Sequence, residues 1–276
     1  MSLRVLRRKM GHGEVLKTIQ SALNHARQAL LKNREGIRIV GRNRFGDTTF
    51  NIDAESDRVI VEEFKKSGEG YTIISEESWV TEVNGGGMVV VVDPLDGSNN
   101  GIRGIPCYCT SIAVADGDKL SDIFASGIIN VVTGDLIFAT QNGVLYNNEH
   151  RQRSNVSELD RSIVSIIPRL YNTDDPKYTD NLLRLLKMIR HPRFLGSAAM
   201  ESAYVSVGLL DAFIELYPRL RVVDLAASLH MAKTSGAYFK LLNIDGDLNL
   251  DYNGRISCIV AANDKLGRAI LQAIRQ

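Results

Sequence analysis

Residues Met88–Ser98 read MVVVVDPLDGS, an unbroken apolar run followed by two carboxylates in a tight turn. The run predicts a buried strand, and Asp93 and Asp96 would lie where that strand ends. Burial of a carboxylate is costly unless a positive group pairs with it, and the turn contains no Lys or Arg. A metal ion is the simplest partner, and the amides of Gly97 and Ser98 could hold an anion beside it. Metal and anion together point to phosphate chemistry.

The composition is that of an ordinary globular protein, with 276 residues of which 44% are hydrophobic and 24% charged. Lys and Arg number 33 against 32 Asp and Glu, and this balance argues against nucleic acid as a partner. No apolar run approaches the roughly 20 residues that span a bilayer. The basic segment Leu3–Lys9 lacks the apolar core of a signal peptide. We therefore expect a cytoplasmic protein without a membrane partner.

The sequence contains three cysteines: Cys107, Cys109 and Cys258. A small, odd number of cysteines does not suit a disulfide framework. Cys107 and Cys109 alternate along an expected strand, so both thiols would face one side. We expect small buried hydrophobic residues there, with a redox or metal-binding role as the less favoured alternative.

Two halves are expected from the rhythm of apolar residues: an antiparallel-rich α+β half at 1–153 and an α/β half at 154–276. Apolar periodicity in the first half predicts helices at Glu14–Lys32 and Asp53–Lys66. Its expected strands are Ile37–Val40, Tyr71–Ile74, Met88–Val92, Tyr108–Ala115, Ile123–Val132, Asp135–Ala139 and Val144–Tyr146. The polar segment Asn33–Thr49 is expected to be a mobile excursion that closes over the site.

The second half is expected to alternate strands with helices. Its expected helices are Tyr178–Ile189, Ala198–Val207, Asp224–Thr234 and Leu266–Ile274. Its expected strands are Ile163–Ile167, Phe194–Leu195, Ala212–Leu216, Tyr238–Leu241 and Ile256–Ala261.

Carboxylates stand at four separated places in suggestive positions. They are Asp47, Glu76-Glu77, the pair Asp93 and Asp96, and Asp224. Taken singly, Asp47 reads as a turn residue, Glu76-Glu77 as a solvated strand end and Asp224 as a helix N-cap. Together they suit hard divalent cations such as Mg²⁺, which take oxygen ligands. The five histidines are scattered, so a zinc site is not expected.

Several motifs, in this order, resemble those of the inositol monophosphatase superfamily. They are Asp47-Thr48-Thr49 with Ile52-Asp53, Ile74-Ser75-Glu76-Glu77-Ser78, Asp93-Pro94-Leu95-Asp96-Gly97-Ser98 and Val223-Asp224-Leu225-Ala226-Ala227. Gly-Ser-Ala-Ala at 196–199 and Leu-Asp-Ala-Phe-Ile-Glu at 210–215 extend the similarity. The chain looks most like the archaeal-type enzymes that hydrolyse fructose 1,6-bisphosphate and inositol monophosphate. Tyr217 departs from that group, which often has Arg there.

The resemblance implies an α+β fold, a layered α/β/α/β/α sandwich of the sugar-phosphatase type, and a homodimer. It implies Mg²⁺-dependent hydrolysis of a small phosphorylated sugar or polyol by metal-activated water, with two or three ions per site and Mn²⁺ as a substitute. The implied metal ligands are Glu76, Asp93, the Leu95 carbonyl, Asp96 and Asp224. The implied catalytic pair is Asp47 with Ser98, and the phosphate binds to the amides of Gly97 and Ser98. The implied contacts to the sugar or inositol ring come from Gly196, Ser197 and Glu215.

Other functions stay open beside this one. A 3′-nucleotide or NADP(H) phosphatase would use the same scaffold. A non-catalytic phosphosugar-binding protein is disfavoured, because all the implied ligands are present. Arg193, Arg219 and Arg221 could meet a second substrate phosphate, and a solvated surface position explains each equally well.

Overall fold

Strand β5 (Met88–Asp96) lies inside an eight-stranded sheet of order β10-β9-β8-β7-β6-β5-β3-β4. It runs parallel to β3 and antiparallel to β6. This computed structural model describes residues 12–33, 36–43, 46–171 and 175–275. The remaining strands of the sheet are β3 (Tyr71–Ser75), β4 (Trp79–Val83), β6 (Cys109–Ala115), β7 (Ile123–Asn130), β8 (Leu136–Thr140), β9 (Gly143–Tyr146) and β10 (Glu149–His150).

A five-stranded sheet of order β12-β11-β13-β15-β14 follows in the chain. Its strands are β11 (Ile163–Ile166), β12 (His191–Arg193), β13 (Ala212–Leu220), β14 (Tyr238–Leu241) and β15 (Ile256–Ala261). The expected division at residues 153 and 154 falls between the last strand of the larger sheet and the first strand of this one.

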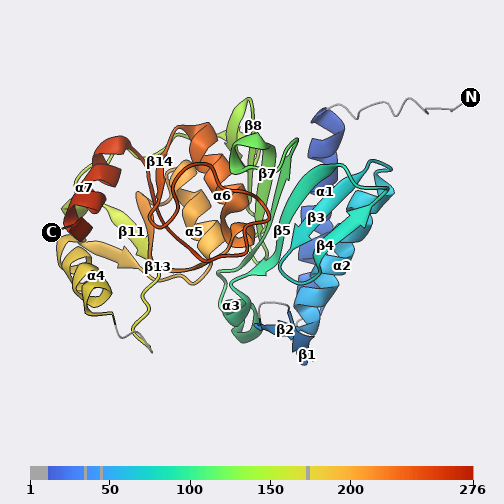
Figure 1. Cartoon of the computed structure of the whole chain (residues 1–276), viewed down its shortest axis with the longest axis horizontal. Coiled ribbons are helices and arrows are strands. Elements are labelled where there is room, and N and C mark those ends of the chain that lie inside the picture. The colour runs from blue at the N-terminus through green and yellow to red at the C-terminus, as the bar shows by residue number, and fades with distance from the viewer. Residues whose placement is uncertain (1–11, 34–35, 44–45, 172–174, 276) are drawn as a thin grey trace, which may run out of the picture.

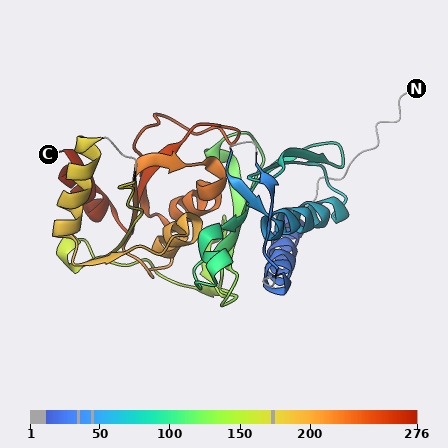
Figure 2. The ribbon, with the colours of Figure 1, turned by 90° about the horizontal axis from the view of Figure 1, so that it is seen from below.

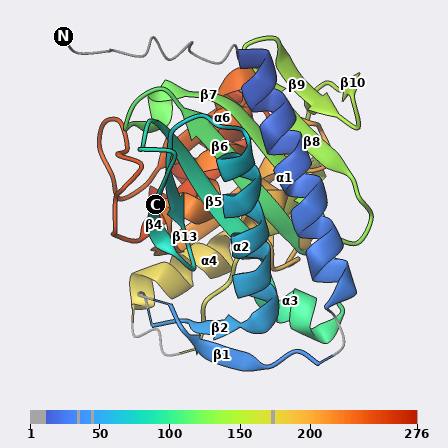
Figure 3. The same cartoon turned by 90° about the vertical axis from the view of Figure 1, so that its right-hand side faces the viewer.

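Helices and sheets alternate in a layered α/β/α/β/α arrangement (Figure 1), and Figure 2 shows the same order from below. Helices α1 (His12–Lys32) and α2 (Asn51–Lys66) lie across the outer face of the larger sheet, as Figure 3 shows. Helices α5 (Ala198–Ser206) and α6 (Val222–Ser235) pack between the sheets, while α4 (Pro176–Met188) and α7 (Asp264–Arg275) cover the far face of the smaller one. The expected α+β layered fold is confirmed.

The central layer ties the two halves of the chain together. One hydrophobic cluster joins Ile74 and Val91 of the larger sheet to Met200 of α5, Leu225 of α6 and Phe213 of the smaller sheet. Because α5 and α6 are covered on two sides, they carry small and apolar residues around most of their circumference.

Most expected elements are present, with ends shifted by a few residues. The strands and α-helices that were not expected are β2 (Thr48–Phe50), β4, β10, β12 and α3 (Ser98–Arg103). The strand expected at Phe194–Leu195 is wrong, because β12 ends at Arg193 and the Phe194 side chain is exposed. Strands β4 and β12 are edge strands of mixed polarity, so their sequences lack a clear apolar alternation.

The expected excursion Asn33–Thr49 contains two strands, of which the sequence predicted only the first, at Ile37–Val40. Strands β1 (Ile39–Arg42) and β2 pair antiparallel into a hairpin, which we call the β1–β2 arm. Figure 3 shows the arm beside the end of α2 where the helix begins. Residues 34–35 and 44–45 of the excursion, like the basic segment Leu3–Lys9, lie outside the described residues.

None of the helices in the described ranges is both long and apolar enough to cross a lipid bilayer. All three cysteines are free thiols. Cys109 and Cys258 are buried, as expected of small hydrophobic residues, and Cys107 is half-buried.

Candidate active site

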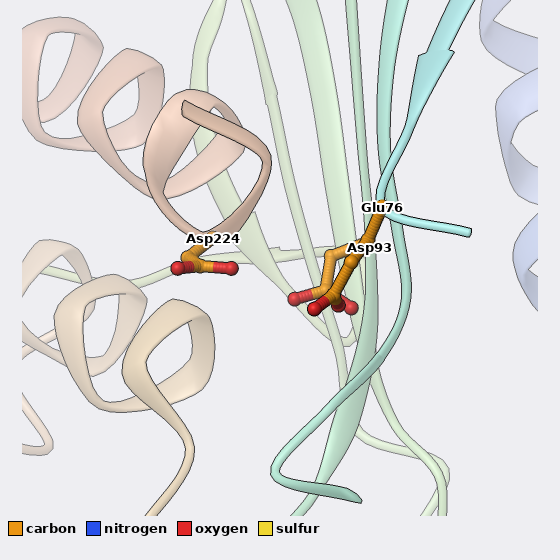
Figure 4. A group of neighbouring side chains, drawn as sticks. All are labelled: Glu76, Asp93 and Asp224. Atoms are coloured by element: carbon orange, nitrogen blue, oxygen red, sulfur yellow. The ribbon is translucent and has the colours of Figure 1, made fainter. Parts of the chain in front are cut away.

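Glu76, Asp93 and Asp224 bring their carboxylates together at one edge of the larger sheet (Figure 4). One oxygen of each lies within 4.8 Å of the others. Glu76 follows β3 directly, and its backbone N–H donates to the Val92 carbonyl across 3.3 Å, beside Asp93 on β5. Because β3 and β5 are parallel, their carboxyl ends meet at the same edge. Asp224 faces them from the first turn of α6.

Helix α6 begins two residues earlier than expected, at Val222, so Asp224 is not its N-cap. The Asp224 carboxylate accepts a hydrogen bond from the N–H of Arg221 across 2.7 Å. This bond orients Asp224 at the helix N-terminus, where a negative charge is favourable.

The turn after Asp93 is shaped by an irregularity in the pairing of β5 with β6. The Leu95 N–H donates to the Asp93 carboxylate across 3.0 Å, and the Ser98 hydroxyl donates to the Leu95 carbonyl across 2.8 Å. Gly97 has a φ of 85°, and a Cβ at this position would lie 3.0 Å from the Gly196 carbonyl oxygen. Gly97 is therefore required both by its backbone conformation and by the close approach of a second loop.

Asp96 lies beside the three carboxylates but is held by its own partners. Its Oδ2 accepts hydrogen bonds from the Ser197 hydroxyl across 2.5 Å and from the Ala199 N–H across 2.9 Å. The Cys109 thiol lies 3.7 Å from the same oxygen.

Burial and mutual repulsion make this cluster electrostatically unfavourable without a cation. Desolvation, followed by the neighbouring carboxylates, raises the pKa of Glu76 and of Asp93 well above the usual range. Desolvation also raises the pKa of Asp224, against the opposing effect of Arg221, and raises the pKa of Asp96 to about 6. Carboxylates in this arrangement attract a positive charge.

Arg221 supplies one positive charge, a role that its sequence context did not indicate. Its guanidinium pairs with Asp47 and donates to Glu76 across 2.7 Å. The side chain is only 6% exposed and lines the cavity with the carboxylates, so a solvated surface position does not describe it. Desolvation lowers the pKa of Arg221 to about 10, which leaves it charged at neutral pH.

The expected catalytic pair, Asp47 and Ser98, lies in the same cavity as the carboxylates. This cavity has a volume of about 850 Å³ and is also lined by Gly97, Gly196 and Arg219. Asp47 pairs with Arg221, and Ser98 bonds to Leu95. A second hollow of about 680 Å³, between α1 and α2, is lined by charged groups that pair with one another, such as Lys66 with Glu63, so we do not place the site there.

The β1–β2 arm is tied down beside this cavity. The Thr49 hydroxyl donates to the Glu77 carboxylate across 2.6 Å, and the Phe50 N–H donates to Asp53 across 2.9 Å. Glu77 thus links the arm that carries Asp47 to the turn that carries Glu76.

Of the three residues expected at the sugar ring, Gly196 lines the cavity, whereas Ser197 and Glu215 have other contacts. Both of these side chains are fully buried. The Ser197 hydroxyl is directed at Asp96, and the Glu215 carboxylate accepts the Tyr217 N–H across 3.0 Å. These contacts do not support direct binding of the ring by Ser197 or Glu215.

Comparison with known proteins extends over nearly the whole chain. The sequence model described as the inositol monophosphatase family matches residues 12–276. A fructose-1,6-bisphosphatase/inositol-1-monophosphatase of Methanothermobacter thermautotrophicus is 35% identical over 243 residues, covering 83% of this chain and 84% of the relative. A protein of the same name from Archaeoglobus fulgidus is 32% identical and covers 95% of this chain and 94% of its own length.

The fold matches solved structures equally well. The crystal structure of an inositol monophosphatase–fructose 1,6-bisphosphatase superposes with a TM-score of 0.80 at 25% identity, over 93% of this chain and 98% of that one. A Thermotoga maritima inositol monophosphatase superposes with a TM-score of 0.76 at 22% identity, over 95% of this chain and 98% of that one, and so shows the fold alone.

Proposed function

The chain belongs to the inositol monophosphatase family and is a phosphatase of that family, and we propose that it uses Mg²⁺ to release phosphate from fructose 1,6-bisphosphate and inositol 1-phosphate. The observation that carries this proposal is the meeting of Glu76, Asp93 and Asp224 beside the Gly97 turn.

The donor set fits a hard divalent cation. The three carboxylates come from three separate segments of the chain. Burial raises the pKa of all three, and neighbouring carboxylates raise those of Glu76 and Asp93 further. Ligands of oxygen alone suit Mg²⁺, and Mn²⁺ would substitute for it. We assign Asp96 and the Leu95 carbonyl to the same centre, which would hold two or three ions. When bound, these ions would neutralise the carboxylates, polarise the phosphoryl oxygens and lower the pKa of the attacking water.

The chain's own residues would orient the reactants. Both Asp47 and Ser98 line the cavity, where they would accept the proton of the attacking water. Gly97 and Ser98 line the cavity beside the carboxylates, and their backbone amides would receive the phosphate. Arg221 keeps Glu76 and Asp47 in fixed positions through its two ion pairs. No covalent intermediate with the protein is required.

Basic residues around the same cavity support a substrate with a second phosphate. Arg169, Arg219 and Arg255 line the cavity together with Tyr217. The guanidinium of Arg169 lies 5.2 Å from the centre of the Tyr217 ring, which limits its range of positions. These groups favour a bisphosphate over a simple monophosphate, because guanidinium binds phosphate well.

An NADP(H) phosphatase remains the second candidate, and one relative supports it. A bifunctional NADP phosphatase/NAD kinase of Methanococcus maripaludis is 27% identical to 82% of this chain, which covers 42% of that protein. NADP also carries several phosphates, so the basic residues of the cavity do not separate it from a sugar bisphosphate.

A panel of phosphate esters tests the proposal. We expect Mg²⁺-dependent release of phosphate with a higher kcat/KM for fructose 1,6-bisphosphate than for inositol 1-phosphate or NADP. Asp93→Asn should remove most of this activity and leave the fold intact. Asp116→Asn, at an exposed position outside the cavity, should keep wild-type activity. Near-normal turnover by Asp93→Asn would sink the assignment, and a preference for NADP would select the second candidate. A homodimer in the cytoplasm is part of the same proposal, and sedimentation velocity tests its oligomeric state.

A further inference from the structure

The turn at Leu195–Ser197 is built against both the carboxylate Asp96 and the Gly97 turn. The Ser197 hydroxyl and the Ala199 N–H hold Oδ2 of Asp96, and the Gly196 carbonyl packs against Gly97. Asn100 of α3 adds a second link, because its side-chain amide donates to the Leu195 carbonyl across 2.7 Å. Any displacement of this turn would therefore move Asp96.

Glu201 on α5 holds the turn from behind. Its Oε1 accepts the N–H groups of Gly196 and Ser197 across 2.7 and 2.8 Å. Its Oε2 accepts the Ser165 hydroxyl of β11 and, more weakly, the Leu195 N–H at 3.4 Å. One carboxylate thus gathers the three consecutive amides of the turn and ties them to the smaller sheet.

Burial of the Glu201 carboxylate has a desolvation cost, which argues that this residue has a specific role. The side chain is fully buried, and desolvation raises the pKa of Glu201 to about 7 against the opposing effect of the turn amides. Helix α5 begins at Ala198, so the N–H groups that Glu201 accepts belong to the turn before the helix, whereas the Ala199 N–H of the first helical turn is held by Asp96. Capping of α5 therefore does not account for this buried carboxylate.

We propose that Glu201 is a positioning residue for the metal centre: its carboxylate fixes the Leu195–Ser197 turn, and through the Ser197 hydroxyl the turn fixes Asp96. This inference rests on the proposed function, because it takes Asp96 as a metal ligand. With Oδ2 held by Ser197 and Ala199, the Asp96 carboxylate is presented in one orientation. Partners that orient metal ligands typically change metal affinity about 10- to 100-fold when they are removed.

The test compares Glu201→Ala and Glu201→Gln with Ser202→Ala in the full chain. Ser202 is the adjacent residue of α5, and its hydroxyl is buried without a hydrogen-bond partner among the described residues. Mg²⁺ binding is measured directly by calorimetry, and the Mg²⁺ concentration for half-maximal phosphate release is measured beside it. Circular dichroism establishes that each variant is folded at the temperature used.

We expect the Mg²⁺ dissociation constant of Glu201→Ala to rise about 10- to 100-fold. The Mg²⁺ dissociation constant of Glu201→Gln should rise less, because the amide oxygen of Gln can still accept the two shorter hydrogen bonds. That of Ser202→Ala should match the wild type. If Glu201→Ala does not fold, Glu201→Gln decides. Folded Glu201 variants with wild-type Mg²⁺ affinity would overturn the positioning role and leave the phosphatase assignment intact. A wild-type chain that neither binds Mg²⁺ nor releases phosphate would overturn both.

Discussion

Arg221 donates from Nη1 to Oε1 of Glu76 across 2.7 Å, so a cation of the chain itself contacts the acidic cluster. The same guanidinium pairs with Asp47, and the Arg221 N–H holds Asp224. One residue therefore connects the β1–β2 arm, the end of β3 and the start of α6. The cluster is organised around this arginine as well as around the proposed metal ions.

Replacing Arg221 should destabilise the protein most strongly when divalent cations are removed. Arg221→Gln leaves the half-buried carboxylates of Glu76 and Asp224 without their cation. Breaking a fully buried ion pair costs about 3–5 kcal/mol, so we expect a smaller loss here, about 1–3 kcal/mol. Added Mg²⁺ should recover part of this loss by binding to the folded state. Urea unfolding with EDTA and with Mg²⁺ measures both effects, and Arg255→Gln, at a position 44% exposed, is the control. Equal losses in the two conditions would contradict this account.

Loss of the Thr49 hydroxyl should loosen the β1–β2 arm. Thr49→Val keeps the side-chain shape but removes the 2.6 Å hydrogen bond to Glu77, so we expect the free energy of unfolding to fall by about 1–2 kcal/mol. We expect kcat to fall as well, because Asp47 is carried by this arm. Steady-state kinetics at saturating substrate checks this result against Thr81→Val on β4. An unchanged kcat in a destabilised Thr49→Val protein would show that the arm needs no such tie.

Glu215 should make the protein less stable as the pH rises toward 8. Burial raises the pKa of Glu215 to about 8, although the Tyr217 N–H opposes this shift. Since the folded pKa lies above the unfolded value, the contribution to stability is complete below about pH 4.5 and is lost as the pH rises through 8. Its size is on the order of 3–5 kcal/mol. Glu215→Gln should therefore flatten the decline in unfolding free energy measured between pH 5 and 8, and an unaltered slope would refute this.

His230 should have the opposite effect on the acid side. Its Nδ1 lies 2.8 Å from the Ser126 hydroxyl, and burial lowers the pKa of the imidazole to about 4. The unfolded chain binds the proton of His230 more tightly than the folded protein does. The contribution of neutral His230 to the free energy of unfolding is therefore complete above about pH 6.5 and is lost as the pH falls toward 4. The loss is on the order of 3 kcal/mol. Unfolding free energies of His230→Gln at pH 4 to 7 should show a shallower acid slope than the wild type, and parallel slopes would argue against it.

Much of the fold was predictable because burial leaves a mark on local sequence. The apolar run before Asp93 predicted a buried strand, and the face of Val15, Ile19 and Leu23 predicted α1. Edge strands β4 and β12 could not be found in this way, because one or both of their faces contact solvent. The exposed arm strand β1 was placed two residues too early for the same reason.

The sequence by itself determined the family, the layered fold and which carboxylates belong to one centre, because the motifs around Glu76, Asp93 and Asp224 are short, contiguous and chemically specific. Only the tertiary structure revealed the contacts of Arg221, Ser197 and Glu201 from which their roles are proposed. Each acts on a residue far from it in the chain or through the backbone of a turn, and neither relation leaves a periodic or compositional signal. The sequence of the turn at Asp93–Ser98 predicts the type of site. The partners that orient its carboxylates and those beside it come from the start of α5, the start of α6 and the smaller sheet.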